Sequence, residues 1–308
     1  MNGILNVLKP PGMTSHDVVS LIRRLTGVRK VGHTGTLDPL AAGVLPVCLG
    51  HATRVIRFLE NDKEYRVEVA FGISTTSGDI SGEVINKCDG SNLSAASLES
   101  ELENFTGETE QIPPMTSAMH FQGKRLYELA RAGRIVERRP RMVKLYSLQL
   151  KRLVDWKTET PLAVLDVVCS AGTYIRSLCM DIGEKLNCGA HVRFLLRTRA
   201  GMFNLDKAIT LEEIQVLKDE NLLEENLISA KEALSHLAEI QIKTSSLPAV
   251  RAGNCLYASG LADLPQQKLS FNESVRLCIG ENLLAIANVR EETNTEGYCL
   301  KPIVVLNT

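Results

Sequence analysis

One segment near the N-terminus combines a specified loop shape with a single carboxylate. Residues 30–43 read KVGHTGTLDPLAAG, and Asp38 is their only acidic side chain. Three glycines, a proline and several small residues propagate neither a helix nor a strand, so they predict a loop whose backbone approaches a ligand closely. A carboxylate held there suits nucleophilic or general-base chemistry. An isolated Asp-Pro pair more often only caps a turn, and the glycine spacing lacks the Lys-Ser/Thr of a phosphate-binding loop.

A second candidate lies at a predicted strand-to-helix junction, where residues 170–178 read SAGTYIRSL. This spacing places Tyr174 and Arg176 in the first turn of a helix, where a cation gains nothing from the helix dipole. Arg176 therefore needs a partner, and a carboxylate from a neighbouring loop would suit; a surface arginine is the ordinary alternative. Tyr65 opens another predicted strand, and taken alone it is most often a core or edge aromatic.

Charge is unevenly distributed along the chain. The 308 residues carry 35 Lys and Arg against 36 Asp and Glu, yet residues 111–209 hold 17 basic and 8 acidic side chains. A basic stretch between acidic flanks is typical of a surface for a polyanion, although solvated faces also produce it. Residues 112–141, here called the arm, concentrate this charge between prolines. Its basic residues are Lys124, Arg125, Arg131, Arg134, Arg138, Arg139 and Arg141.

The elements that must position these residues alternate between strands and helices. Periodicity and turn signals predict strands over 3–9, 44–49, 65–71 and 191–197, with 143–154 and 162–169 as a pair. Helices are predicted from Thr14 or Ser15 to Gly27, with Asp17 in a capping box, and over 51–59, 93–105, 173–186 and 210–239. From about residue 245, short runs at 274–279, 283–289 and 303–306 predict a small all-β domain. This mixed order indicates an α+β fold.

Composition excludes several classes of protein. The length predicts two domains, and 44% hydrophobic with 23% charged residues is typical of a globular chain. No apolar run approaches the roughly 20 residues of a membrane span, and the first residues do not resemble a signal peptide, so we expect a cytoplasmic protein without a membrane. Eight cysteines without a Cys-x-x-Cys pair and six scattered histidines argue against a zinc site or a disulfide framework.

Four motifs in order resemble the TruB family of pseudouridine synthases. They are the GHTGTLDP loop at 32–39, the KPPG turn at 9–12, the YRV strand at 65–67 and GTYIRSL at 172–178. The resemblance runs from about Gly3 to Arg199 and extends, more loosely, to a C-terminal domain similar to a PUA (RNA-binding) fold. It implies a catalytic domain over 1–240, built on a mixed, mostly antiparallel sheet with flanking helices. An RNA-gripping insertion would lie at about 111–141, and the PUA-like domain at 245–308.

The resemblance also implies an activity, the isomerisation of uridine 55 in the T-loop of tRNA to pseudouridine by base flipping. No metal or other cofactor is expected. The expected partner is the T-arm of tRNA, bound by a monomer without an obligate protein partner. Three alternatives stay open: a non-catalytic RNA-binding or tRNA-folding protein, a guide-RNA-dependent synthase, and an enzyme that binds the phosphate of a small molecule.

Site residues follow from the same resemblance. Asp38 matches the family's catalytic aspartate, Tyr65 its active-site tyrosine and Arg176 the arginine that pairs with the aspartate, which we expect to lower the pKa of Asp38. The implied substrate-binding residues are His33, Tyr174, Leu195, Lys9, Pro10, Lys124, Arg125, Arg138, Arg139 and Arg141. Whether Asp38 adds to a carbon or assists removal of a sugar proton stays open.

The chain also departs from the family pattern at several positions. Thr75-Thr76-Ser77 replaces the common Thr-Asp-Thr, and Ala42 replaces a usual threonine. In the arm, Thr116 and His120 occupy positions where Tyr and Lys are common. These departures put individual arm contacts in doubt and leave the catalytic set intact.

Overall fold

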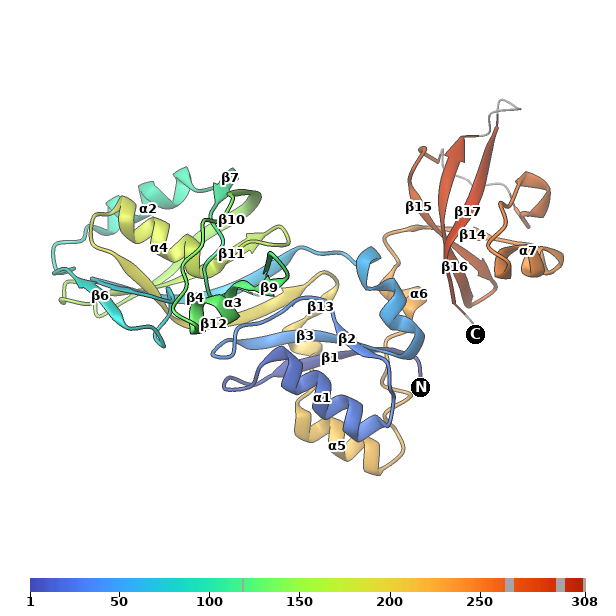
Figure 1. Cartoon of the computed structure of the whole chain (residues 1–308), viewed down its shortest axis with the longest axis horizontal. Helices are drawn as coiled ribbons and strands as arrows, with labels where there is room; N and C mark the ends of the chain where they lie inside the picture. The colour runs from blue at the N-terminus through green and yellow to red at the C-terminus, as the bar shows by residue number, and fades with distance from the viewer. Residues whose placement is uncertain (118, 264–268, 292–296, 307–308) are drawn as a thin grey trace.

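A nine-stranded sheet and a separate four-stranded sheet organise the chain (Figure 1). The computed structural model describes residues 1–117, 119–263, 269–291 and 297–306, and the side chains of Tyr127 and Arg131 lie outside that description. Within these ranges, no helix is long and apolar enough to cross a membrane.

The large sheet carries the catalytic candidates, and its path runs β1-β3-β12-β4-β11-β10-β7. Neighbours on this path are antiparallel except for β12 and β3, so the predicted α+β fold with a mostly antiparallel sheet is confirmed. In path order the strands are Gly3–Lys9, Ala42–Leu49, Ala190–Ala200, Lys63–Phe71, Leu162–Cys169, Arg141–Val154 and Gly107–Gln111. Two short strands complete it, since β2 (Val31–His33) pairs with β3 and β13 (Phe203–Asn204) with β12.

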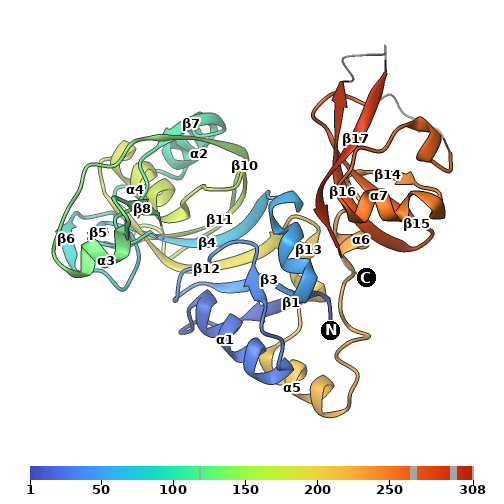
Figure 2. The ribbon, with the colours of Figure 1, turned by 45° about the vertical axis from the view of Figure 1, so that its right-hand side comes forward.

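Helices cover this sheet and bury the main core. The predicted capping box is present, because Asp17 N donates to Thr14 Oγ1 at 3.0 Å and Thr14 N donates to the Asp17 carboxylate at 2.8 Å. Gly27 ends α1 with φ at 69°, a left-handed conformation that glycine adopts without strain. The helices are α1 (Ser15–Thr26), α2 (Ala95–Asn104), α4 (Ile175–Lys185) and α5 (Leu211–Asp219). Helices α1 and α5 lie side by side below the sheet in Figures 1 and 2.

Two predicted helices differ from the structure. Residues 51–59 were expected to be α-helical, but Gly50–Phe58 forms a 3₁₀ helix, the tighter form used in short connections. The acidic stretch 210–239 contains α5 and the separate four-residue helix α6 (Ala230–Ala233) instead of one continuous helix.

The arm leaves the sheet where β7 ends and returns where β10 begins, with Gln111 paired to Arg141. Within it, a short hairpin precedes the helix α3 (Leu126–Arg131). The hairpin strands are β8 (His120–Phe121) and β9 (Lys124–Arg125). The two ends of the arm are therefore neighbours on adjacent strands at the sheet edge.

The second sheet has the order β14-β15-β16-β17, and only its first pair is parallel. Its strands are Ala238–Gln241, Ser274–Ile279, Asn282–Glu291 and Tyr298–Val305. The expected strand 274–279 coincides with β15, whereas the all-β expectation is wrong at α7 (Leu247–Arg251). Its PUA-like character and the domain limits stay predictions.

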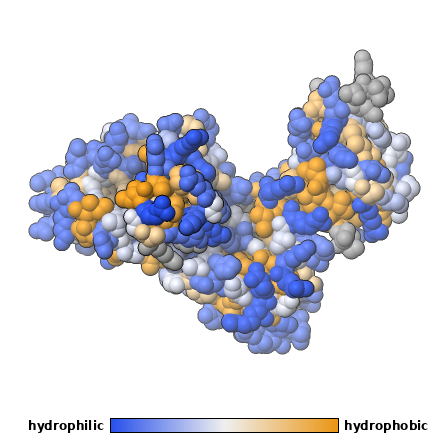
Figure 3. All heavy atoms as spheres, in the orientation of Figure 1, coloured by the Kyte–Doolittle hydropathy of each residue, from blue (hydrophilic) through white to orange (hydrophobic). Residues whose placement is uncertain are grey.

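An apolar cluster joins the second sheet to the first. Ile4 and Val55 on the catalytic side belong to the same buried cluster as Ile286 and Val304 of β16 and β17. Arg54 adds a hydrogen bond to the Val305 carbonyl at 2.5 Å. On the face shown in Figure 3, a wide hollow separates the outer parts of the two sheets above this junction.

Candidate active site

The loop that carries Asp38 is held from the side of α1. Ser15, the first residue of that helix, uses its hydroxyl twice: it accepts from Leu37 N at 2.8 Å and donates to Leu37 O at 3.1 Å. Gly12 N donates to Pro39 O at 2.8 Å. The residues on both sides of Asp38 are therefore tied to the first strand-helix connection.

Lys9, the last residue of β1, supports the same loop from the protein interior and does not reach solvent. Its side chain is completely buried, and its ammonium donates to the carbonyls of Pro10 at 2.8 Å, Met13 at 2.6 Å and Pro39 at 3.3 Å. Burial lowers the pKa of Lys9 to about 8, while nearby Asp38 acts in the opposite direction. All three ammonium contacts of Lys9 are with the protein's own backbone, so the structure gives this side chain a supporting role under the loop, and its contact with substrate stays a prediction. Pro10 stays a prediction.

Arg197 of β12 holds the loop from the other side. This arginine is 1% exposed, and it donates to the carbonyls of Val44 at 2.7 Å, Gly35 at 3.1 Å and Thr36 at 3.5 Å. The parallel contact of β3 with β12 requires glycine at position 43, where φ is 115° and a Cβ would overlap the Arg197 backbone. One buried guanidinium thus joins the two flanks of the Asp38 loop.

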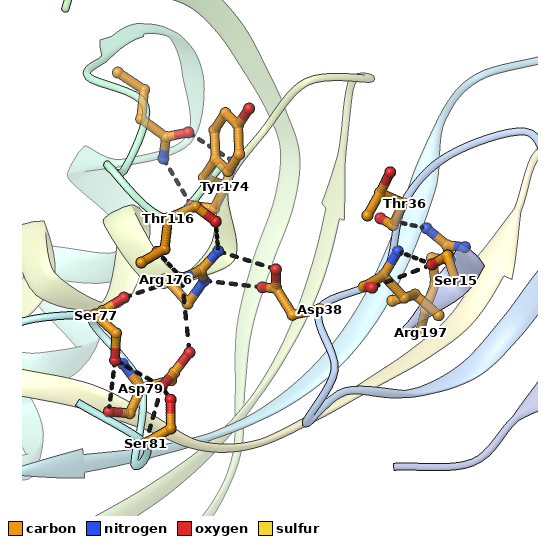
Figure 4. A network of polar contacts seen from close by, with 12 residues as sticks. Ser15, Thr36, Asp38, Ser77, Asp79, Ser81, Thr116, Tyr174, Arg176 and Arg197 are labelled. Atoms are coloured by element: carbon orange, nitrogen blue, oxygen red, sulfur yellow. Dashed lines mark hydrogen bonds and ion pairs between the residues drawn. The ribbon is translucent and has the colours of Figure 1, made fainter. Parts of the chain in front are cut away.

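Asp38 and Arg176 form a two-pronged ion pair (Figure 4). Arg176 Nη2 donates to Asp38 Oδ1 at 2.9 Å, and Arg176 Nε lies 2.8 Å from Oδ2. The Arg176 side chain is 5% exposed and that of Asp38 is 32% exposed. The expected carboxylate partner for Arg176 is therefore present, with its oxygens aimed by a guanidinium fork and still reachable from outside.

Two further segments contact the same guanidinium. Arg176 Nη1 donates to Ser77 O at 3.1 Å and to Thr116 Oγ1, and it lies 3.6 Å from Asp79 Oδ2. The Asp79 carboxylate is itself held by the hydroxyls of Ser77 at 2.7 Å and Ser81 at 2.5 Å. Arg176 is thus shared by two carboxylates and the arm, as Figure 4 shows.

The electrostatics of Asp38 differ from the expectation. Burial raises the pKa of the Asp38 carboxyl above its ordinary value of 3.8; Arg176 opposes this shift, Asp79 adds to it, and Lys9 opposes it more weakly. The expectation of a low pKa is wrong, because the loss of solvation outweighs the single strong counter-charge. Asp38 is therefore a carboxylate kept basic by its surroundings.

Apolar side chains complete the site. Tyr65 and Leu195 belong to the main core and are 8% and 7% exposed, and the register of β4 with β12 sets Tyr65 opposite Arg197. Burial raises the pKa of the Tyr65 phenol, with Arg197 acting in the opposite direction. A pocket beside Asp38 is lined by Asp38, Leu40, Ala41, Asp79, Arg176, Val192, Arg193, Phe194 and Leu195, so Leu195 lines it and Tyr65 does not. Its walls are suited to a flat, largely apolar group beside a carboxylate.

His33 and Tyr174 belong to the two motifs that carry Asp38 and Arg176. His33 ends β2, and its Nδ1 accepts a hydrogen bond from Gly35 N at 3.2 Å, which places the proton of the neutral ring on Nε2. Burial, assisted by Arg197, lowers the pKa of His33. Tyr174 is the N-cap of α4 and not a residue of its first turn, and the side chain of Gln111 brackets its backbone at 2.7 and 3.0 Å. Substrate contact by His33 and Tyr174 stays a prediction.

The predicted arm cations mostly face solvent. The exposed ones among the described side chains are Lys124, Arg125, Arg134, Arg139 and Arg141. Arg138 instead donates to Pro113 O at 3.0 Å, so it joins the two ends of the arm. The side chain of Arg131 lies outside the described part of the chain. RNA contact by this group stays a prediction.

Sequence reasoning missed Arg197, Asp79 and Ser15. Arg197 had a usable signal, because it follows the apolar run Phe194-Leu195-Leu196 in a predicted strand, and an arginine that is buried there needs internal acceptors. Asp79 and Ser15 gave no such signal, since both are ordinary turn and helix-start residues. Among the described residues, no group of three or more His, Cys, Asp or Glu side chains is placed to hold a metal ion.

Comparisons with known proteins agree over the whole chain. Residues 23–175 match the TruB family pseudouridylate synthase N-terminal domain, and residues 176–235 match the tRNA pseudouridylate synthase B C-terminal domain. A protein of Pelotomaculum thermopropionicum named tRNA pseudouridine synthase B is 52% identical and covers 99% of this chain and 97% of its own length. The protein of that name from Moorella thermoacetica is 44% identical, with 99% of both chains covered.

Solved structures give the same fold. A chain of an H/ACA RNP bound to a substrate RNA containing 2′-deoxyuridine aligns with a TM-score of 0.75 at 27% identity, covering 99% of this chain and 85% of that one. A chain of a Cbf5-Nop10-Gar1 complex aligns with a TM-score of 0.75 at 29% identity, covering 98% of this chain and 84% of that one.

The sheet, the aspartate loop and these matches define the class of protein, a pseudouridine synthase. Enzymes of this class are isomerases. The chain belongs to the TruB family of pseudouridylate synthases.

Proposed function

We propose that this enzyme converts uridine 55 in the T-loop of tRNA to pseudouridine, acting alone and without a cofactor. The observation that carries the proposal is the Asp38–Arg176 ion pair at a pocket whose lining combines charged and apolar side chains. The relatives named tRNA pseudouridine synthase B, 43% to 52% identical over nearly the whole chain, support tRNA as the substrate.

The proposed reaction moves one bond and exchanges one proton. The N1–C1′ bond of the uridine breaks, the uracil turns within the pocket, and a C5–C1′ bond forms. The hydrogen on C5 then leaves as a proton and N1 gains one, so the product is an isomer and no electrons are exchanged with a second reactant. Asp38 either adds to a carbon of the substrate or takes a proton from the sugar.

The remaining site residues have distinct proposed roles. Arg176 aims the Asp38 oxygens, and burial keeps that carboxylate basic. Tyr65 and Leu195 would pack on the detached uracil and keep it beside C1′ while it turns. Because the pKa of Tyr65 is raised, its neutral phenol is suited to packing more than to proton removal.

Recognition would combine shape and charge. A base inside a folded loop must be flipped out at a cost of a few kcal/mol. Phosphate contacts from the exposed arm cations would offset that cost and set the register, while the shape of the T-loop would supply specificity. His33, two residues after the start of β2, is the proposed surface against which the displaced nucleotide stacks.

A guide-RNA-dependent synthase is the second candidate, because the aligned solved chains come from H/ACA complexes. Those chains are 27% and 29% identical, whereas the relatives named tRNA pseudouridine synthase B reach 52%. The higher identity favours action on tRNA without a guide.

The test uses the purified chain alone with tRNA transcripts that carry tritium at C5 of uridine. The proposal expects release of one label per tRNA into water, and no release from a transcript with cytidine at position 55. Release that requires a guide RNA and partner proteins would establish the second candidate. Equal release from both transcripts would remove the position assignment.

A further inference from the structure

Thr116 brings the arm into direct contact with the guanidinium of the site. Arg176 Nη1 donates to Thr116 Oγ1, and Arg176 Nη2 lies 3.4 Å from the Thr116 carbonyl, which accepts its hydrogen bond. Figure 4 shows Thr116 on the opposite side of the guanidinium from Asp79. Thr116 lies on the arm, five residues after the end of β7, and it is exposed.

Hydrogen bonds join the end of β7 and the start of the arm to helix α4 and its N-cap. Gln111 brackets the backbone of Tyr174, and Ser177 Oγ donates to Ile112 O at 3.0 Å. These contacts hold the beginning of the arm beside the helix that carries Arg176. Thr116 extends this connection to the charged end of the Arg176 side chain.

The acceptors around Arg176 are divided between two sides. Ser77 O and the Asp79 carboxylate draw Nη1 toward the 77–79 turn, at 3.1 and 3.6 Å. Among the described contacts, Nη1 has one more acceptor, the Thr116 hydroxyl, and this acceptor lies on the arm and not in the 77–79 turn. Without the Thr116 hydroxyl, Nη1 contacts only the acceptors of the 77–79 turn. The guanidinium then loses the acceptor that balances the attraction of this turn, which draws it away from Asp38.

We propose that Thr116 is a positioning residue, which holds the Arg176 fork against Asp38 and makes that alignment depend on how the arm is seated. The inference rests on the proposed function, because it assigns the arm as the segment that grips RNA. A tRNA that holds the arm in this position preserves both hydrogen bonds from Arg176 to Thr116. An RNA that displaces the arm removes them, so the aspartate is aligned best when the correct RNA is bound.

The test compares three variants of the full chain. Thr116→Val removes the hydroxyl at nearly constant shape, Thr116→Ser keeps it, and Ser117→Ala removes a neighbouring buried hydroxyl that has no partner among the described residues. We expect Thr116→Val to lower the single-turnover rate at saturating tRNA about tenfold, the effect of losing a hydrogen bond to a charged group. Its tRNA affinity stays within twofold, and the other two variants keep rate and affinity within twofold of the wild type.

A second readout needs no activity on tRNA. The groups that act on Asp38 are Arg176, Asp79 and Lys9, and a fork that has moved away lets the carboxyl titrate at higher pH. Carboxyl NMR of Asp38 should therefore show a titration shifted to higher pH in Thr116→Val and an unchanged one in Thr116→Ser and Ser117→Ala.

The outcomes separate this inference from the proposed function. A wild type inactive on tRNA, with the Asp38 titration still shifted in Thr116→Val, would support the positioning role and count against the proposed function. An active wild type with an unchanged rate and titration in Thr116→Val would overturn the positioning role alone. Weaker tRNA binding at an unchanged rate would make Thr116 an RNA contact and also overturn it.

Discussion

Charged residues surround the Asp38 loop and also occur on the arm, but those around the loop are buried and hydrogen-bonded, whereas those on the arm are mostly exposed. Around the loop, Lys9 and Arg197 are buried, and their donors bind backbone carbonyls at 2.6–3.5 Å. On the arm, Lys124 and Arg139 are exposed and form no ion pair among the described residues. Buried charges are expensive unless they are bonded, so these bonds restrict the arrangement of the loop.

This difference in burial corresponds to the different requirements of catalysis and of phosphate binding. Chemistry at a carbon atom needs a carboxylate placed to within a fraction of an ångström, which only a shell of directed bonds supplies. Phosphate binding depends on charge near a polyanion and tolerates variation in geometry. Substitutions in the loop should therefore act on rate, and substitutions on the arm should act on affinity and its salt dependence.

The largest effect should come from Asp38→Asn, which keeps the shape and removes the ionisable group. We expect the rate of tritium release to fall by at least about a thousandfold, with tRNA affinity changed by a few-fold at most. Single-turnover assays and filter binding measure the two quantities. Asp206→Asn, an exposed aspartate outside the site, is the control. Full activity in Asp38→Asn would remove Asp38 from the mechanism.

Arg176→Lys should have the next largest effect, because lysine keeps the charge and loses the fork. A rate about a hundredfold lower at saturating tRNA is expected. The matched control is Arg66→Lys, since Arg66 forms a similar fork with Asp166, at 2.8 Å to both oxygens, on a side chain that is 52% exposed. Equal losses in both variants would show that the fork at Arg176 has no special role.

The pH dependence tests the basicity of Asp38. Its pKa is raised above 3.8 by burial, so the active carboxylate is present above the raised value and is lost as pH falls through it. The single-turnover rate should therefore fall about tenfold per pH unit on the acid side, starting above the ordinary aspartate range. Circular dichroism at each pH checks that the chain stays folded. A constant rate down to the ordinary aspartate pKa would contradict the raised value.

The smallest effect should come from the double variant Lys124→Ala/Arg139→Ala, which removes two exposed cations of the arm. We expect tRNA affinity several-fold weaker and a salt slope shallower by about 0.7 for each phosphate that the variant no longer neutralises, with the saturated rate within twofold. Lys87→Ala with Lys157→Ala removes the same charge from exposed positions outside the arm. Equal effects of the two pairs would mean that the arm has no special part in RNA binding.

Local physics made several elements predictable. The strand over Gly3–Lys9 and the strand pair β10–β11 follow from apolar patterning, and α1 follows from its Thr14–Asp17 capping box and Gly27. These signals lie within a few residues of each other, so a linear reading detects them. The 3₁₀ geometry of Gly50–Phe58 was missed because α and 3₁₀ helices share the same local pattern.

The amino-acid sequence by itself determined the order of the elements, the family resemblance and Asp38 as the carboxylate of a glycine-rich loop. Only the tertiary structure decided that Lys9 is buried under that loop, that Arg176 is shared with Asp79 and Thr116, and that the pKa of Asp38 is raised. Arg176 lies 138 residues from Asp38, and Arg197 lies 162 residues from Gly35. Desolvation and directed bonds depend on which distant segments meet, and that is a property of the packed chain.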